Sequence, residues 1–171
     1  MASQLKCEMH ERPWRDWAVD RNLDDRWLER LNNLESLSLV SICEGHLDVK
    51  PKCVKRRPCI ILRPKEAYMM PLTVRWYELK EAIAVEIERI WPDKETIVEF
   101  EIQHRLVKNG DPLEDIEDII IRITSDRKRD VVILPEWIDH WFRQALSRIE
   151  TFDQFMKTLF IINKEQGEIE Q

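Results

Sequence analysis

The stretch Thr96-Ile97-Val98-Glu99-Phe100-Glu101-Ile102-Gln103-His104-Arg105-Leu106 alternates between two kinds of side chain. Its even-numbered positions are mostly apolar, whereas the odd-numbered positions from Glu99 to Arg105 are polar. Because successive residues of a strand point to opposite faces, this period of two predicts a strand with one buried face. A turn signal follows at Asn109-Gly110-Asp111-Pro112, and the apolar segment 116–124 can return antiparallel to the first strand.

Two further strands are expected upstream of this hairpin. The segment Leu37–Cys43 alternates, and Cys59–Arg63 is a short apolar run that Pro64 ends, with a loop from Leu47 to Pro58 between them. Residues Val131–Leu134 predict one more short strand. Short connections between strands favour an antiparallel or mixed sheet of four to five strands.

The helix signals lie between and after these strands. Apolar residues recur at helical spacing before Pro92, after a connection from Glu66 to Pro71; they are Leu72, Trp76, Leu79, Ile83, Ile87 and Ile90. Pro135 suits the first turn of another helix. The sequence Thr151-Phe152-Asp153-Gln154 fits a capping box, which predicts that a separate last helix begins there.

The amino-terminal region also predicts helices. Trp14 and Trp17 are three residues apart, which favours a short helix laid on the core. Asn22 is the expected cap of a second helix that ends near Leu34 or Glu35. Together these elements predict a single α+β domain over residues 1–171, with helices packed against the sheet and a polar tail from about residue 164.

Composition narrows the class of protein. The chain has 171 residues, 43% of them hydrophobic and 35% charged, as expected of a globular protein. The amino terminus lacks a secretory signal, and no apolar run approaches the length of a membrane helix, so a cytoplasmic protein is expected. Only three glycines occur, which excludes the dinucleotide fingerprint and the phosphate-binding P-loop. In a reducing compartment the four cysteines are expected to be thiols or metal ligands.

The candidate site begins at Ser41-Ile42-Cys43-Glu44-Gly45-His46, where the first strand of the sheet ends. A basic run without any acid follows, although the whole chain carries a net charge of −6; it comprises Lys50, Lys52, Lys55, Arg56, Arg57, Arg63 and Lys65. Arginine side chains bind phosphate or carboxylate oxygens in pairs, and a glycine permits close approach. The first hypothesis is therefore an anion- or phosphate-binding loop formed by Gly45, His46, Arg56, Arg57 and Arg63.

Two other chemistries use the same region. Thiolate and imidazole are good zinc ligands, so Cys43, His46, Cys53 and Cys59 form a candidate metal site. Alternatively, Cys43 is a catalytic nucleophile with His46 as its base. If the cysteines are instead structural, the chain is a non-enzymatic interaction protein whose acidic surface meets a basic partner.

The pattern Ser-x-Cys-x-Gly-His at positions 41–46, preceded by a strand, resembles the Ser-x-Ser-Ser-Cys-Ser-Gly-Arg region of the wybutosine-synthesis tRNA methyltransferases. Glu44 stands where that family has serine, and His46 where it has arginine. The resemblance implies a tRNA-modifying enzyme that uses S-adenosylmethionine, with Ser41, Cys43 and Gly45 at the matching positions. The acidic net charge disfavours tight binding of nucleic acid. The partner expected from the residues alone is an anionic small molecule or a phosphate group.

Overall fold

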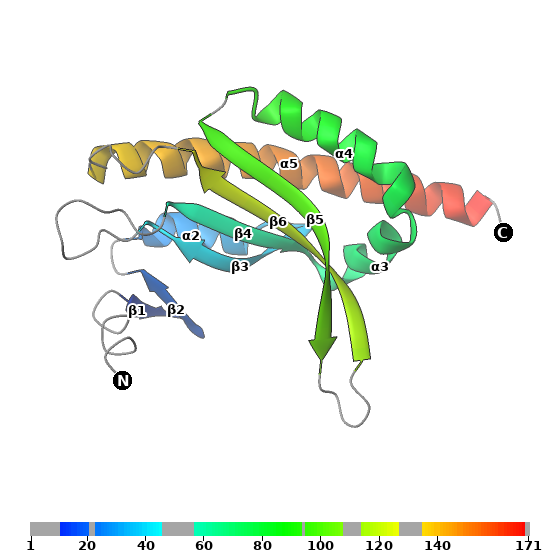
Figure 1. The fold of residues 1–171 in the computed structure, drawn as a ribbon, viewed down its shortest axis with the longest axis horizontal. Helices are drawn as coiled ribbons and strands as arrows, with labels where there is room; N and C mark the ends of the chain where they lie inside the picture. Colours follow the sequence, from blue (N-terminus) through cyan, green and yellow to red (C-terminus); the bar gives the residue numbers. More distant parts are fainter. Residues whose placement is uncertain are drawn as a thin grey trace.

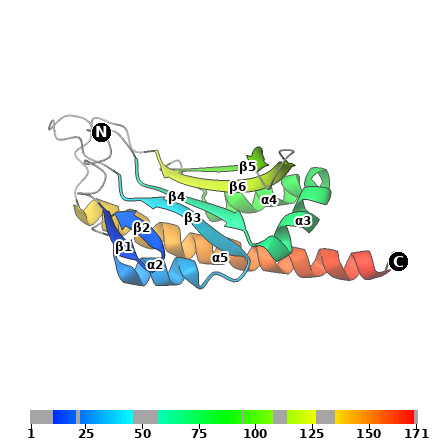
Figure 2. The ribbon, with the colours of Figure 1, turned by 90° about the horizontal axis from the view of Figure 1, so that it is seen from below.

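The computed structural model describes residues 11–20, 23–45, 57–93, 95–107, 114–126 and 135–169. In these residues a four-stranded sheet carries helices on one face, and a two-stranded hairpin lies beside it (Figure 1). Figure 2 shows the four-stranded sheet as one layer, with α2 (Asp25–Asn32) and α5 (Pro135–Ile169) in the layer beneath it. The predicted α+β class and the four-stranded sheet are therefore confirmed.

The sheet is antiparallel throughout, in the order β3-β4-β6-β5. Its strands are β3 (Leu37–Cys43), β4 (Cys59–Pro64), β5 (Thr96–Val107) and β6 (Glu114–Ser125). β5 and β6 pair from Thr96↔Ser125 to Val107↔Glu114, as the alternating sequence predicted. The order places β3 and β5 at the two edges among the described strands. The strand expected at Val131–Leu134 lies outside the described residues.

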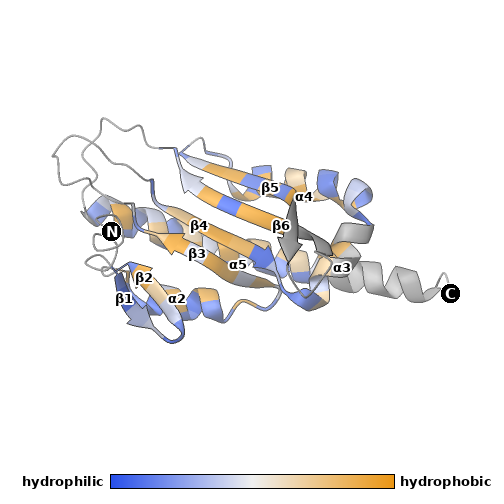
Figure 3. Ribbon diagram, turned by 60° about the horizontal axis from the view of Figure 1, so that its bottom comes forward, coloured by the Kyte–Doolittle hydropathy of each residue, from blue (hydrophilic) through white to orange (hydrophobic). Residues whose placement is uncertain are grey.

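The core lies between the sheet and α5. On the covered face, Ile60 and Leu62 of β4 and Ile121 and Ile123 of β6 are completely buried, in one cluster with Phe142 of α5. Figure 3 shows the apolar residues that run along β4 and β6. Burial of each such side chain stabilises the fold by about 2 kcal/mol. The opposite face of β4 carries half-exposed side chains, and no described helix covers that face (Figure 2).

The expected amino-terminal helix is a hairpin instead. β1 (Glu11–Trp14) pairs antiparallel with β2 (Trp17–Asp20), and Trp14 and Trp17 are partners across a two-residue turn. Arg15 in this turn has a φ of 53°, a value that tight hairpin turns require. A spacing of three residues fits both a helix face and a two-residue turn. The helix prediction was therefore wrong, because the spacing alone does not separate the two structures.

Three helix boundaries also differ from the predictions. Asp24 caps α2, since its side chain accepts a hydrogen bond from the Arg26 amide, whereas the expected cap Asn22 lies outside the described residues; α2 ends at Asn32, before the expected Leu34 or Glu35. The predicted connection 66–71 is helical and belongs to α3 (Glu66–Val74). A break at Arg75 separates α3 from α4 (Trp76–Ile90), which ends before Pro92 as predicted.

The last helix does not begin at Thr151, because α5 runs without interruption from Pro135 to Ile169. The Thr151 hydroxyl donates to the Ser147 carbonyl within the helix. Asp153, which the capping-box prediction assigned to this helix start, accepts hydrogen bonds from the Glu35, Ser36 and Leu37 amides. The prediction was wrong because Thr151 bonds a carbonyl of the preceding helical turn and Asp153 bonds a distant segment, so neither residue caps a helix start.

Candidate functional site

The two cysteines that flank the loop between β3 and β4 lie opposite each other. Cys43 is the last residue of β3, Cys59 is the first of β4, and the two are partners in the register. Opposed residues of antiparallel strands have Cβ atoms about 5 Å apart. Both are free thiols; Cys43 is 8% exposed and Cys59 is half-buried. The fold thus brings together two of the predicted metal ligands at the base of one loop.

A buried carboxylate holds the turn that follows Cys43. Asp20, at the end of β2 and 5% exposed, accepts a hydrogen bond of 2.8 Å from the Glu44 amide to its Oδ2. It also accepts from the Cys43 thiol. Gly45 has a φ of 89°, which glycine adopts at little cost, and its amide donates to the Cys43 sulfur. Sequence reasoning missed Asp20, because its role depends on the hairpin that was expected to be a helix.

The Cys43 thiol is protonated at neutral pH in these surroundings. Burial raises its pKa to about 12, since a thiolate would lose its hydration. The Gly45 amide opposes this effect, whereas the negative charge of Asp20 adds to it. The reactive form of cysteine is the thiolate. The environment of Cys43 therefore does not favour the nucleophile hypothesis, whose proposed base, His46, lies outside the described residues.

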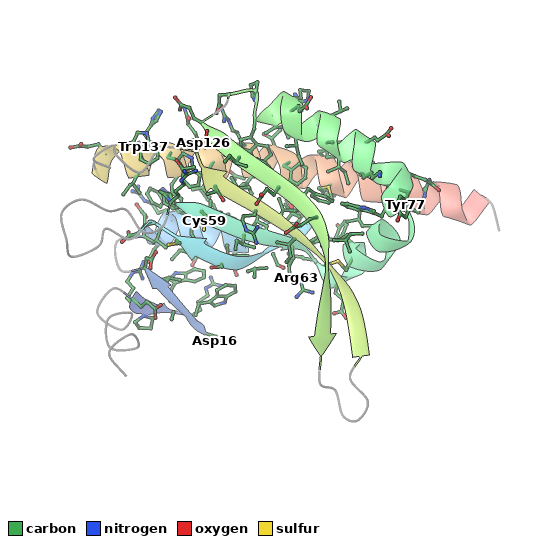
Figure 4. All side chains as sticks on the ribbon, in the orientation of Figure 1. Asp16, Cys59, Arg63, Tyr77, Asp126 and Trp137 are labelled. Carbon is green, nitrogen blue, oxygen red and sulfur yellow. The ribbon has the colours of Figure 1, made fainter. Side chains whose placement is uncertain are left out.

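The described members of the predicted anion site lie apart. Arg57 Nη1 is 3.3 Å from Asp126 Oδ1, beside the start of β4. Arg63 is four residues beyond Cys59 on the same strand, a separation of about 13 Å. Figure 4 shows Cys59 and Arg63 well separated along the sheet. The Glu44 amide next to Gly45 already binds the Asp20 carboxylate. Arg56 and His46 lie outside the described residues.

No family model, curated protein or solved structure matches this chain. The resemblance to wybutosine-synthesis methyltransferases stays a prediction, and saturable binding of S-adenosylmethionine, measured by calorimetry, is its test. Within the described ranges, no helix is both long enough and apolar enough to cross a membrane.

The described part of the chain contains two of the four predicted metal ligands. No three His, Cys, Asp or Glu side chains gather there closely enough to hold a metal ion. Cys43 and Cys59 supply two ligands, and a closed zinc site needs four. The remaining predicted ligands, His46 and Cys53, belong to the connection between β3 and β4 and lie outside the described residues. Any further ligands of a metal at this position must therefore come from residues outside the described ranges, which include that connection.

Proposed function

We propose that this chain is a non-enzymatic interaction protein whose β3–β4 connection is organised by a zinc ion bound to Cys43, His46, Cys53 and Cys59. The observation that carries the proposal is the pairing of Cys43 with Cys59 across the two strands. Two thiols fixed at adjacent positions lose little further freedom on binding one metal ion. His46 and Cys53 lie between them in the sequence, so one hairpin connection contains all four ligands.

The hydrogen bonding around Cys43 supports metal binding over nucleophilic catalysis. The Gly45 amide points at the sulfur, and such a donor stabilises a thiolate. Burial and Asp20 act in the opposite direction and keep the free thiol protonated. A divalent cation between the two sulfurs offsets both of these effects, because it replaces the lost hydration and balances the carboxylate charge. Metal uptake at Cys43 then releases a proton.

The role of this zinc is structural. A metal at the base of the connection ties the end of β3 to the start of β4, and structural zinc sites of this kind add directly to folding free energy. Cysteines that bind a metal instead of forming disulfides suit a cytoplasmic protein, where disulfides are rare. The interaction role follows from the acid excess of the chain, which favours a basic partner.

The test is the metal content of untagged protein purified without chelators. We expect one zinc per chain in the wild type, loss of that zinc in Cys43→Ser and in Cys59→Ser, and retention in Cys7→Ser. Cys7 is the matched control because it is the one cysteine that the proposal leaves unused. Stoichiometric zinc that survives both Cys43→Ser and Cys59→Ser would remove the assigned site.

A second measurement separates zinc from a disulfide between the same cysteines. Opposed cysteines are close enough for a disulfide as well. We expect four thiols per chain to react with a thiol reagent after metal removal and unfolding without reductant. A count of two, with no zinc bound, would contradict the proposal.

A further inference from the structure

The β5 edge of the sheet has no strand beside it in the described part of the chain, where β5 pairs with β6 alone. Its exposed backbone groups are a template for another strand. β5 has 12 residues, which is about 40 Å of strand. α4 runs along this edge, beyond β5 (Figure 1). An added strand would therefore meet both the β5 backbone and the side chains of α4.

An apolar groove of about 480 Å³ lies between α4 and β5. We name it the α4–β5 groove. Its floor comes from Ile83 and Ile87 of α4 and Val98 of β5, and Trp76 stacks on Phe100 with ring centroids 5.0 Å apart. Ala84, a small exposed residue, also lines it. The groove has room for apolar side chains from alternate positions of an extended peptide.

Both elements that form the groove expose apolar side chains. Tyr77 is 83% exposed and Val85 is 67% exposed, both on α4, and Ile97 of β5 is also exposed. The charges around them are mainly acidic. Glu81 and Glu88 line the groove together with Lys80, which lies over the Tyr77 ring.

The outward face of β5 adds two more carboxylates, Glu99 and Glu101, both exposed. They share the Arg122 guanidinium, whose Nη1 is 3.1 Å from Glu99 and 3.8 Å from Glu101. The edge therefore offers an apolar groove on one side of β5 and two exposed carboxylates on the other.

We propose that the β5 edge and the α4–β5 groove bind an extended segment of a partner protein in which apolar and basic residues alternate. The segment adds a strand to β5 through main-chain hydrogen bonds, its apolar side chains enter the groove, and its basic side chains face Glu99 and Glu101. This inference names the partner class for the interaction role proposed above, and it does not depend on the zinc ion.

The same charges disfavour a second copy of the chain that pairs with this edge about Phe100. If two β5 strands paired antiparallel about Phe100, Glu99 of one copy would lie opposite Glu101 of the other. Like charges directly opposite each other destabilise a strand pair. A basic segment meets no such repulsion, so in this register the charge pattern favours a basic segment over a second copy.

The test is fluorescence anisotropy with the full chain and a labelled peptide of alternating valine and lysine. We expect saturable binding that weakens with salt, and no binding of a valine–glutamate peptide. The double charge reversal Glu99→Lys/Glu101→Lys should weaken binding of the lysine peptide about tenfold or more. Ala84→Phe, which fills the groove, should also weaken it. Glu11→Lys/Asp16→Lys on the β1–β2 hairpin is the matched control, because it makes the same change in net charge away from the edge, and it should have no effect.

A lysine peptide with N-methyl groups at alternate backbone positions separates strand addition from charge attraction alone. We expect it to bind about tenfold more weakly or worse, because methylation removes main-chain donors. Equal binding of both peptides, no binding of either, or a concentration-dependent dimer through β5 would overturn the proposal. Chelator treatment should leave peptide binding unchanged, so failure here is distinguishable from failure of the zinc site.

Discussion

A buried aspartate lies at each end of β3, and the two have different surroundings. At the start of β3, Asp153 of α5 is 2% exposed and accepts from the Glu35, Ser36 and Leu37 amides at 2.8–3.0 Å. The Ser36 hydroxyl also donates to it, at 2.6 Å. At the other end, Asp20 accepts from the Glu44 amide and from the Cys43 thiol.

The comparison separates a structural carboxylate from one beside a candidate site. The hydrogen-bond donors to the Asp153 carboxylate are three backbone amides and one serine hydroxyl. Asp20 faces a thiol that can lose a proton or bind a metal. We infer that Asp153 holds the fold together and that Asp20 controls the chemistry of Cys43.

The largest expected effect comes from Asp153→Ala. This change leaves three backbone amides without their acceptor, two of them buried, and we expect a loss of about 3–5 kcal/mol in the free energy of unfolding. Urea denaturation measures it. Asp139→Ala is the matched control on the same helix, because Asp139 makes an exposed ion pair with Arg143 and should contribute less than about 1 kcal/mol. Equal effects of the two substitutions would contradict the structural role of Asp153.

The next effect concerns Asp20. Asp20→Ala leaves the Glu44 amide unpaired and should cost about 1–3 kcal/mol. Asp20→Asn retains an acceptor for that amide but removes the negative charge beside Cys43. We therefore expect the pKa of Cys43 to fall in Asp20→Asn, and the rate of its alkylation in metal-free protein to rise at a given pH. An unchanged pH profile of alkylation would show that Asp20 does not act on the thiol.

A smaller effect is the pH dependence of stability in metal-free protein. The pKa of Cys43 is about 12 in the folded state and 9.0 ordinarily, so its contribution is complete below pH 9 and is lost between pH 9 and 12. From pH 8 to pH 10 the wild type should lose about 1 kcal/mol more than Cys43→Ala. Parallel pH profiles of the two proteins would contradict the raised pKa.

The smallest expected effects are those of substituting Arg57 and Arg63. Arg57→Ala removes a partly exposed ion pair, so stability should change by less than about 1 kcal/mol. Neither Arg57→Ala nor Arg63→Ala should alter zinc content. Calorimetry with phosphate tests the anion-loop hypothesis directly. Saturable phosphate binding by the wild type that each of the two substitutions abolishes would support that hypothesis.

The sequence predicted the elements whose pattern is local. The alternation at 96–106 predicted β5, and the alternation at 37–43 predicted β3, because one face of each strand is apolar. The helix predicted from Trp14 and Trp17 was wrong, since their spacing fits a helix as well as a hairpin. The helix start predicted at Thr151-Phe152-Asp153-Gln154 was wrong for another reason. The hydrogen-bond partners of Asp153 lie more than a hundred residues away in the sequence.

The candidate site was predictable to a similar extent. The sequence alone placed Cys43 at the end of one strand and Cys59 at the start of the next. Their pairing follows if the two strands are antiparallel neighbours. Asp20 could not be identified, because nothing local to β2 indicates that it reaches the turn after Cys43. The α4–β5 groove was also missed, since it depends on where α4 lies relative to the sheet edge.

The most direct test of the central claim is titration of the metal-free protein with Co²⁺, whose spectrum reports its ligands. We predict sulfur-to-metal charge-transfer absorption and the visible bands of a tetrahedral ion, saturating at one Co²⁺ per chain and displaced by Zn²⁺. The charge-transfer band should weaken in Cys43→Ser and in Cys59→Ser but not in Cys7→Ser. A wild-type spectrum no different from that of Co²⁺ in buffer would contradict the account.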